Sequence, residues 1–396
     1  MKFDMILFEH LHSAKNHWKD VHIIARLLCS VGWNVAILDL YHDIQRNEIY
    51  GIPIIRPTYK GSIPCDDFIY KNINGVKRII FSIRYCIQQH KYMKNIYEEI
   101  KDMADSFYIG SYLFFPTIVF MNINKPCYYW GLRSNVFGGL FDLFRNHMII
   151  QAPYLLFAKY LFLKNKHQQM FVSNEIIKNE FVQRGIPDTR LIIREERPYE
   201  INNKVIIKDK NDQKTFMVIG LLRPEKHVIE TINAFKAANV DNSILLVVGK
   251  CKDRKYEELI DKEILNIENI KRIKGYIEEE EFHNYFYQSD YVIFADEKGS
   301  CCITNGTMQE SLMHYTPVIV PNYNPYTYYM KKNKIGIEYN YDDLNSLAEA
   351  IRNACNIDKR YFSQSIASHL NSIDFNKVAQ LLSEQIEMNI RQIAAE

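Results

Sequence analysis

One pattern constrains the fold of this chain more than any other: a strand, a loop and a helix follow one another in both halves of the sequence. Residues 3–8 predict a strand, residues 20–31 a helix and residues 34–40 a second strand. The order begins again at residues 216–220 and 228–238, which predict a strand and a helix. Because strands that alternate with helices form parallel sheets, the pattern predicts an α/β protein with a parallel sheet in each half.

Further apolar runs extend both series. The other predicted strands of the first half are 106–109, 117–121, 127–130 and 170–173, and residues 137–166 form a long helical stretch. The second half continues with strands at 244–248, 270–273, 291–294 and 318–320 and with helices at 256–264 and 279–288. Each half thus contains the strands for a sheet of its own.

The length of the chain agrees with two domains. Its 396 residues exceed the roughly 250 to 300 at which a single core usually divides. The polar, charged segment 202–214 is the best candidate for the boundary. We expect an N-terminal domain at residues 1–205, a C-terminal domain at 206–370, and a separate terminal helix at 371–396 with Asp374 as its cap.

Composition argues against several classes of protein. The 49 basic and 47 acidic residues leave a net charge of +2, which gives no general electrostatic basis for binding nucleic acid. The eight cysteines form no Cys-x-x-Cys pair, so zinc-finger spacing is absent and a reduced, cytoplasmic chain is favoured. The first residues, MKFDMILFEH, interrupt their apolar run with charges and predict neither a signal peptide nor a membrane span.

The segment SCCITNGTMQESLMHYTPVIVPN, residues 300–322, carries the clearest sign of a ligand site. Thr307 and Glu310 have the spacing of a capping box, which predicts the start of an amphipathic helix that ends at Thr316. The N–H groups and the positive end of that helix would face the turn Thr304, Asn305 and Gly306, where glycine lets a ligand approach the backbone. The arrangement is typical of a phosphate-binding turn.

Six blocks of sequence between residues 170 and 351 carry a resemblance to a known family. In chain order they are MFVSNEIIKNEFVQRGIPDTRLII, VIGLLRPEKHVIETINAF, LLVVGK, IKGYIEEEEFHNYFYQSDYVIF, ESLMHYTPVIVPN and IGIEYNYDDLNSLAEAI. They resemble the C-terminal domain of GT-B fold glycosyltransferases of the broad family 4 type, glycosyl transferases group 1, and the last block resembles its closing helix. The resemblance implies an α/β fold of two doubly wound, Rossmann-like domains that face each other across a cleft, and a terminal helix that crosses back to the first domain.

The resemblance also implies where a nucleotide diphosphate sugar, the donor, binds. The implied donor residues are Gly220, Arg223, Lys226, Ile277, Thr304, Asn305, Gly306, Thr307 and Glu310. Lys226 and Arg223 would offset the charge of the diphosphate, and Glu310 would contact the donor ribose. The acceptor, a glycan or a lipid-linked glycan, would then bind to the first domain.

Two departures from the family pattern leave the donor sugar and the retaining or inverting outcome open. Leu221 stands where the family usually has its Arg, two residues before Arg223, and Cys302 stands where it has the first glutamate of its E-x7-E pattern. Either Glu297 takes over the sugar contact, or the loop uses its Thr-Asn-Gly-Thr run instead, which is the interpretation that we prefer.

No metal and no other cofactor is expected. Glycosyltransferases of the other main fold use an Asp-x-Asp pair, because a divalent cation must bridge carboxylates and diphosphate. The chain has no such pair; residues 39–41, Asp-Leu-Tyr, come nearest and lack the second carboxylate. This favours the metal-independent plan.

The first half offers weaker candidates. His10 and His12 lie in the loop after the first strand, where an inverting enzyme needs a general base. Arg133 follows the strand 127–130 and is a candidate for binding an acceptor phosphate. Basic and aromatic residues occur together at 71–95 and 148–166, which favours peripheral contact with an anionic membrane surface.

The sequence therefore predicts a glycosyltransferase that moves a sugar to a hydroxyl of a glycan or lipid-linked glycan. Its setting would be bacterial surface polysaccharide synthesis, such as capsule or lipopolysaccharide, in the cytoplasm or at the inner face of the cytoplasmic membrane. Two alternatives remain: a nucleotide-sugar 2-epimerase of the same fold, and a catalytically silent protein that binds sugar nucleotides or acts as a scaffold. The donor base, the sugar and the linkage are not indicated by the residues.

Overall fold

The chain folds into two compact units. The computed structural model describes residues 2–9, 18–42, 44–59, 76–110, 123–130, 152–194, 198–200, 213–251, 253–298 and 306–395. Unit 1 consists of Met1–Glu196 and Phe375–Glu396, and unit 2 of Arg197–Asp374. The boundaries between the units thus follow residues 196 and 374, whereas the sequence analysis placed them after residues 205 and 370.

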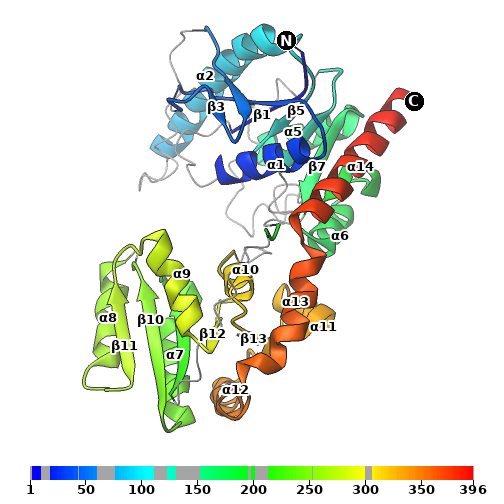
Figure 1. The fold of residues 1–396 in the computed structure, drawn as a ribbon. Coiled ribbons are helices and arrows are strands. Elements are labelled where there is room, and N and C mark those ends of the chain that lie inside the picture. The colour runs from blue at the N-terminus through cyan, green and yellow to red at the C-terminus, as the bar shows by residue number, and fades with distance from the viewer. Residues whose placement is uncertain are drawn as a thin grey trace. The chain divides into compact units, whose positions relative to one another are not determined.

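Unit 1 is built on an eight-stranded sheet with the order β3-β4-β2-β1-β5-β6-β7-β8 (Figure 1). Its strands are β1 (Phe3–Phe8), β2 (Val35–Leu38), β3 (Glu48–Ile49), β4 (Ile52–Ile55), β5 (Ala104–Ile109), β6 (Cys127–Trp130), β7 (Gln168–Val172) and β8 (Leu191–Ile193). Only the β3–β4 pair among them is antiparallel. The chain order reverses between β1 and β5, which is where open α/β sheets bind ligands.

The middle strands are apolar because helices cover a parallel sheet on both faces. Met5 and Leu7 of β1 are fully buried and share a core with Leu28 of the first helix. The helices of unit 1 that precede unit 2 in the chain are α1 (Trp18–Ser30), α2 (Val76–Ile100), α5 (Ala152–Lys164), α6 (Glu175–Gln183) and the short η5 (Asp188–Arg190).

The terminal helix α14 (Phe375–Ala395) belongs to unit 1 although it follows unit 2 in the chain. It packs against α1, and Trp33 Nε1 donates a hydrogen bond of 2.8 Å to Ser383 Oγ. Figure 1 shows α14 in red beside α1. Val378, Leu382 and Ile386 form its buried stripe, as expected for an amphipathic helix on a domain core.

Unit 2 has a six-stranded, fully parallel sheet with the order β11-β10-β9-β12-β13-β14. Its strands are β9 (Lys214–Ile219), β10 (Ser243–Gly249), β11 (Ile270–Lys274), β12 (Tyr291–Ile293), β13 (Val318–Pro321) and β14 (Gly336–Tyr339). The order corresponds to 3-2-1-4-5-6, the arrangement of dinucleotide-binding folds. The switch point therefore lies between β9 and β12.

Helices surround this sheet and bury one continuous apolar core, in which α7 and α12 pack against each other. The helices of unit 2 are η6 (Pro224–Lys226), α7 (Val228–Ala238), α8 (Arg254–Ile264), α9 (Glu279–Gln288), α10 (Gly306–Met313), α11 (Tyr326–Asn333), α12 (Leu344–Asn356), η7 (Lys359–Phe362) and α13 (Ser363–Ser372). Within the described parts of the chain, no helix is both long enough and apolar enough to cross a membrane.

The α/β class and the parallel sheets are confirmed, with local corrections. The last family-like block contains a strand, β14, before its helix α12, because residues 336–339 extend the sheet beside β13. The edge strands β3 and β8 and the strand β4 next to β3 were not predicted; β3 and β8 have two and three residues, and β4 contains Pro53. The predicted strand 117–121 and residues 137–151 of the long helical stretch lie outside the described residues.

Candidate functional site

The loops after β9 and β12 meet at the switch point of unit 2. The backbone N–H of Glu297, after β12, donates a hydrogen bond of 2.7 Å to the carbonyl of Glu225, after β9. This bond fixes the two loops relative to each other at the carboxyl ends of adjacent strands. The switch point is thus a defined polar surface rather than two independent loops.

Gly220 ends β9 in a conformation that favours glycine. Its φ is +118°, and its N–H donates a hydrogen bond of 3.1 Å to the carbonyl of Val248. Gly249, at the end of β10, has a φ of +125°, and a Cβ there would lie 2.0 Å from the carbonyl oxygen of Gly220. The close approach of the two strand ends therefore requires glycine at 249, and the positive φ favours glycine at 220.

A cation and a hydroxyl converge above Gly220. A Cβ on Gly220 would lie 3.3 Å from Lys226 Nζ and 3.7 Å from Thr307 Oγ1, so the absent side chain leaves room beneath both groups. Lys226 Nζ donates a hydrogen bond of 3.3 Å to the carbonyl of Ile219. The structure thus brings together three of the predicted donor residues: Gly220 and Lys226 from the segment after β9, and Thr307 from α10.

Arg223 is placed differently from Lys226. Its side chain is 45% exposed, and its Nε lies 3.9 Å from Glu225 Oε2. An exposed pair at this distance is weak and is screened by salt. Arg223 therefore offers a mobile charge at the rim, while Lys226 is held against the strand end.

Helix α10 brings Thr307 to this surface, but not as its cap. The helix begins at Gly306 and ends at Met313, so Thr307 lies in its first turn and the predicted capping box is wrong. The hydroxyl of Thr307 lies beside Gly220. On the opposite side of α10, Gln309 is buried and its Oε1 accepts a hydrogen bond of 3.1 Å from His369 Nε2.

Two aromatic residues that the sequence analysis missed lie next to the same loops. The ring of His227, which directly follows Lys226, stacks on Tyr341 at a centroid distance of 6.3 Å. The hydroxyl of Tyr341 accepts a hydrogen bond of 3.1 Å from the N–H of Lys298, after β12. His227 was detectable from its position; Tyr341 was not, because β14 itself was not predicted.

The other predicted residues are distributed as follows. Ile277 is partly buried and packs on the core of unit 2. Gly306 begins α10, and Glu310 lies one turn further along. Thr304, Asn305, Cys302, Arg133, His10 and His12 lie outside the described residues.

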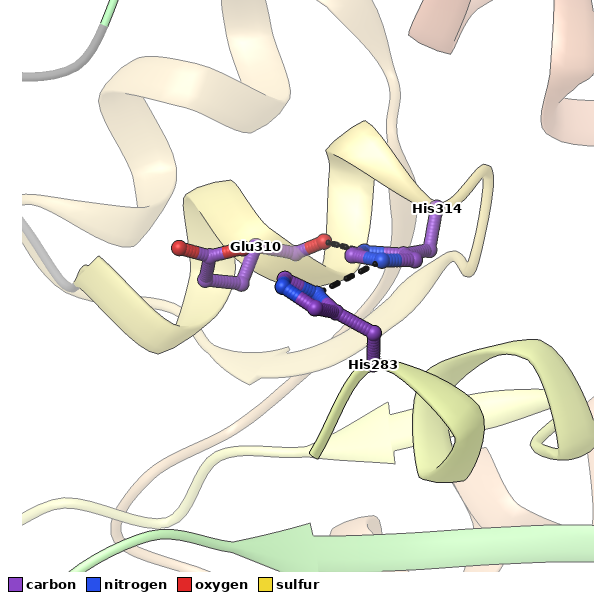
Figure 2. Close-up of side chains that lie close together, drawn as sticks. All are labelled: His283, Glu310 and His314. Carbon is purple, nitrogen blue, oxygen red and sulfur yellow. Dashed lines mark hydrogen bonds between the residues drawn. The ribbon is translucent and has the colours of Figure 1, made fainter. Parts of the chain in front are cut away.

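A second cluster, also missed, lies at the other end of α10. Figure 2 shows Glu310 of α10, His314 just after α10 and His283 of α9 close together, with the carboxylate of Glu310 on the side away from the His314 ring. His283 Nδ1 and His314 Nε2 are 3.0 Å apart, and His314 Nδ1 lies 2.7 Å from the carbonyl oxygen of Glu310. Burial lowers the pKa of His314. The spacing of four residues between Glu310 and His314 was the available signal.

The carboxyl edge of the unit 1 sheet carries a different set of groups. Glu9, directly after β1, is fully buried, and a Cβ on Gly110, after β5, would lie 2.9 Å from its Oε2. Arg194 is 1% exposed, and its guanidinium lies 4.0 Å from the centre of the Trp130 ring. Burial raises the pKa of Tyr108 well above its usual value, although Arg194 opposes that shift. None of these residues was predicted.

Comparison with known families identifies the second unit. Residues 200–365 match the family described as glycosyl transferases group 1. Unit 2 is a glycosyl transferases group 1 domain. No curated protein sequence matches the chain.

Solved structures extend the similarity of fold to both units. HepE from Anabaena, solved in complex with UDP and glucose, is 12% identical with a TM-score of 0.63, covering 97% of this chain and 99% of that one. Sucrose-phosphate synthase from Thermosynechococcus elongatus is 14% identical with a TM-score of 0.68, covering 99% of each. The lipopolysaccharide outer core galactosyltransferase WaaB is 11% identical with a TM-score of 0.64, covering 98% and 99%. The fold is therefore GT-B, as the sequence predicted.

Proposed function

We propose that the protein is a glycosyltransferase that moves a sugar from a nucleotide diphosphate donor to a hydroxyl of a glycan or lipid-linked glycan. The observation that carries the proposal is the convergence of Lys226 Nζ and Thr307 Oγ1 above the left-handed Gly220 at the switch point of unit 2. A leaving diphosphate needs fixed donors and a nearby cation, and this surface supplies both.

The chemistry follows from charge. As the bond between the sugar and the diphosphate breaks, negative charge grows on the departing oxygen. Lys226 would stabilise that charge through a charge-assisted hydrogen bond, and Thr307 would donate a second one. The turn of Thr304 and Asn305 before α10 would add backbone donors, and Glu310 would bind the ribose. Sugar transfer is then favoured because the transition state is bound more tightly than the intact donor.

We further propose that transfer needs no divalent cation. Lys226 and, at the rim, Arg223 provide positive charge without a bound ion, and the chain has no Asp-x-Asp pair. His10 or His12 would act as the base if the reaction inverts, and Arg133 would bind an acceptor phosphate. The expected setting is bacterial surface polysaccharide synthesis in the cytoplasm, which the similarity to a lipopolysaccharide galactosyltransferase supports.

Contact with an anionic membrane is part of the proposal. Leu156, Tyr160 and Leu163 of α5 are 37%, 56% and 37% exposed, and their spacing places them on one stripe of the helix. Phe157 is 50% exposed beside them, and Lys164 Nζ lies 5.9 Å from the Tyr160 ring. Apolar side chains flanked by lysine suit a surface that carries lipid-linked acceptors.

The donor site is tested by a thermal-shift screen with UDP, GDP, ADP and TDP and their sugars, followed by transfer assays with the base that binds. A ligand at about 100 times its dissociation constant adds ~2.7 kcal/mol of stability, so a true donor raises the melting temperature clearly. We expect a shift in the wild type that is reduced in Lys226→Ala and kept in Lys271→Ala, an exposed lysine on β11. If no nucleotide shifts the wild type, the donor site is wrong.

Product analysis distinguishes the alternatives. Sugar transfer or slow donor hydrolysis in the presence of EDTA supports a metal-independent transferase. Formation of the 2-epimer of UDP-N-acetylglucosamine without an acceptor would establish an epimerase instead. Nucleotide binding with neither reaction would favour a silent scaffold.

Membrane contact has a separate test. We expect the protein to sediment with anionic liposomes at low salt, and Tyr160→Ser with Leu163→Ser to weaken this sedimentation. Equal sedimentation of the wild type with neutral liposomes, or none with either, contradicts the contact.

A further inference from the structure

The cluster of His283, Glu310 and His314 has the composition of a metal site. One side-chain ligand atom from each residue lies within 4.8 Å of those of the other two, and all three residues are partly buried. Two imidazoles and one carboxylate are a common set for Zn²⁺ in proteins, with a fourth position left for water. We propose that these three residues bind a divalent transition-metal ion such as Zn²⁺.

The distance between the imidazoles fits this role. His283 Nδ1 and His314 Nε2 are 3.0 Å apart and face each other in Figure 2. In a tetrahedral site with metal–nitrogen bonds of about 2.0 to 2.1 Å, two ligating nitrogens lie roughly 3.3 Å apart. A metal ion therefore needs only a small opening of the pair, in which it replaces the hydrogen bond between the rings.

The second contact of His314 prepares its ring for a metal. Its Nδ1 lies 2.7 Å from the carbonyl oxygen of Glu310, which can only accept, so Nδ1 carries the proton and Nε2 keeps its lone pair. Metal-bound histidines are usually oriented in this way by a carbonyl or carboxylate at the far nitrogen. Phe286 stacks on the same ring at 5.2 Å and restricts its rotation.

The carboxylate needs the largest adjustment. One carboxylate oxygen of Glu310 lies within 4.8 Å of a ring nitrogen of each histidine, against roughly 3.3 Å between ligands around Zn²⁺, and rotation of the Glu310 side chain can close this difference. The backbone between these two residues stays in place, since His314 directly follows α10 and its N–H donates a hydrogen bond of 3.2 Å to the carbonyl of Glu310. His283 comes from α9, so the ion would join two helices.

Metal binding would reach the donor site through Glu310. This consequence rests on the proposed function, in which the same carboxylate binds the donor ribose. A carboxylate held by Zn²⁺ is no longer available to a ribose, and nucleotide affinity falls. The ion would thus act as an inhibitor and not as the cation of the transfer reaction.

The test is a titration with Zn²⁺ in competition with a chromophoric chelator, without nucleotide. The key variant is His283→Gln, whose amide can still donate to His314 but offers no imidazole nitrogen. We expect it to bind one ion fewer than the wild type or to bind that ion more than roughly 100-fold more weakly, since even the loss of outer hydrogen bonds costs 10- to 100-fold. His90→Gln, on α2, is the matched control and should bind as the wild type does.

The outcomes are distinguishable. Identical Zn²⁺ binding by the wild type and His283→Gln overturns the proposal, as does a wild type that binds no ion. Circular dichroism establishes that the variant is folded, and unchanged UDP affinity without Zn²⁺ shows that its donor site is intact. A wild type that binds Zn²⁺ and keeps its UDP affinity would retain the metal site and remove Glu310 from the donor site, while failure of all nucleotide binding concerns the proposed function alone.

Discussion

The two switch points share a strand order but differ in their chemistry. In unit 2, Lys226 and Thr307 converge on a left-handed glycine at the end of β9. In unit 1, Glu9 and Arg194 are buried at the corresponding edge, and a tryptophan ring covers the guanidinium. The described residues of unit 2 thus present a cation and a hydroxyl at the switch point, whereas those of unit 1 keep charged groups inside the domain.

The largest effect should come from the glycine that lets the unit 2 strand ends approach. Gly249→Ala places a Cβ 2.0 Å from the backbone oxygen of Gly220, which cannot move without breaking the sheet. We expect a loss of more than about 3 kcal/mol in the free energy of unfolding, measured by urea denaturation. Gly275→Ala is the control: its φ is +96° but no atom lies within 4 Å, so only about 1 kcal/mol should be lost. Equal losses would show that the approach of Gly249 is unimportant.

In unit 1 we expect a large loss of stability when the buried cation Arg194 is replaced. Arg194→Ala removes a side chain that fills the core and stacks on Trp130, and we expect it to cost about 3 kcal/mol of unfolding free energy. Arg194→Lys should recover only part, because lysine lacks the planar group that stacks. Nucleotide affinity, measured by calorimetry, should not change in either variant. Weaker nucleotide binding with normal stability would instead make Arg194 a ligand residue.

Low pH should destabilise the protein at the buried side of α10, where His369 contacts Gln309. Burial lowers the pKa of His369 from 6.5 to about 4, and Asn333 Nδ2 and Gln309 Oε1 lie 3.2 Å and 3.1 Å from its two nitrogens. Asn333 thus donates to Nδ1, so a proton added there would face another donor. Because the folded pKa lies below the unfolded value, the stability from neutral His369 is complete above pH 6.5 and is lost as the pH falls toward about 4.

The size of this effect is about 2 to 3 kcal/mol. Other groups also titrate over the same range, so the measurement compares the wild type with His369→Gln. We expect the difference in unfolding free energy between them to shrink from pH 7.5 to pH 4.5. A difference that stays constant would mean that His369 does not titrate in this window.

Within unit 2, Lys226 should govern ligand affinity rather than stability. Lys226→Ala removes the charge above Gly220, and we expect UDP to bind roughly 30-fold more weakly, equivalent to about 2 kcal/mol. Isothermal titration calorimetry measures this, with Lys271→Ala as the matched loss of one exposed charge. The unfolding free energy without ligand should change by less than about 0.5 kcal/mol. Unfolding of the variant, or unchanged UDP affinity, would contradict the comparison of the two switch points.

The sequence predicted more of the fold than of the candidate site. Strands β1 and β9 were predicted because continuous apolar runs mark buried parallel strands. Strands β14 and β4 were missed, because pairing with neighbouring strands, and not composition, determines that these residues are strands. Among the site residues, Gly220 and Lys226 lie close in sequence and were predicted together. Their approach to Thr307 depends on the order of strands in the sheet.

Contacts between distant elements explain the remaining gaps. The sequence interpreted Thr307 as a helix cap from local spacing, but the helix begins one residue earlier and its hydroxyl lies beside Gly220. His283 and His314 stand on different helices, so no local motif joins them. The burial of Glu9 and Arg194 likewise follows from the packing of unit 1. Local chemistry thus predicted which residues are polar, while topology determined which of them meet.

The smallest expected effect is on UDP binding, and it distinguishes Arg223 from Lys226 at the switch point of unit 2. Arg223 is exposed and lies 3.9 Å from Glu225, so part of its charge is already offset and the rest is screened by solvent. We expect Arg223→Ala to weaken UDP binding by at most about threefold, or about 0.6 kcal/mol, at 0.15 M salt. At 0.02 M salt the loss should grow, because screening is weaker, whereas the effect of Lys226→Ala should change little. If instead Arg223→Ala equals Lys226→Ala at both salt concentrations, then Arg223 leaves Glu225 to bind the diphosphate directly, and the guanidinium occupies the role that the family gives to the arginine missing at Leu221.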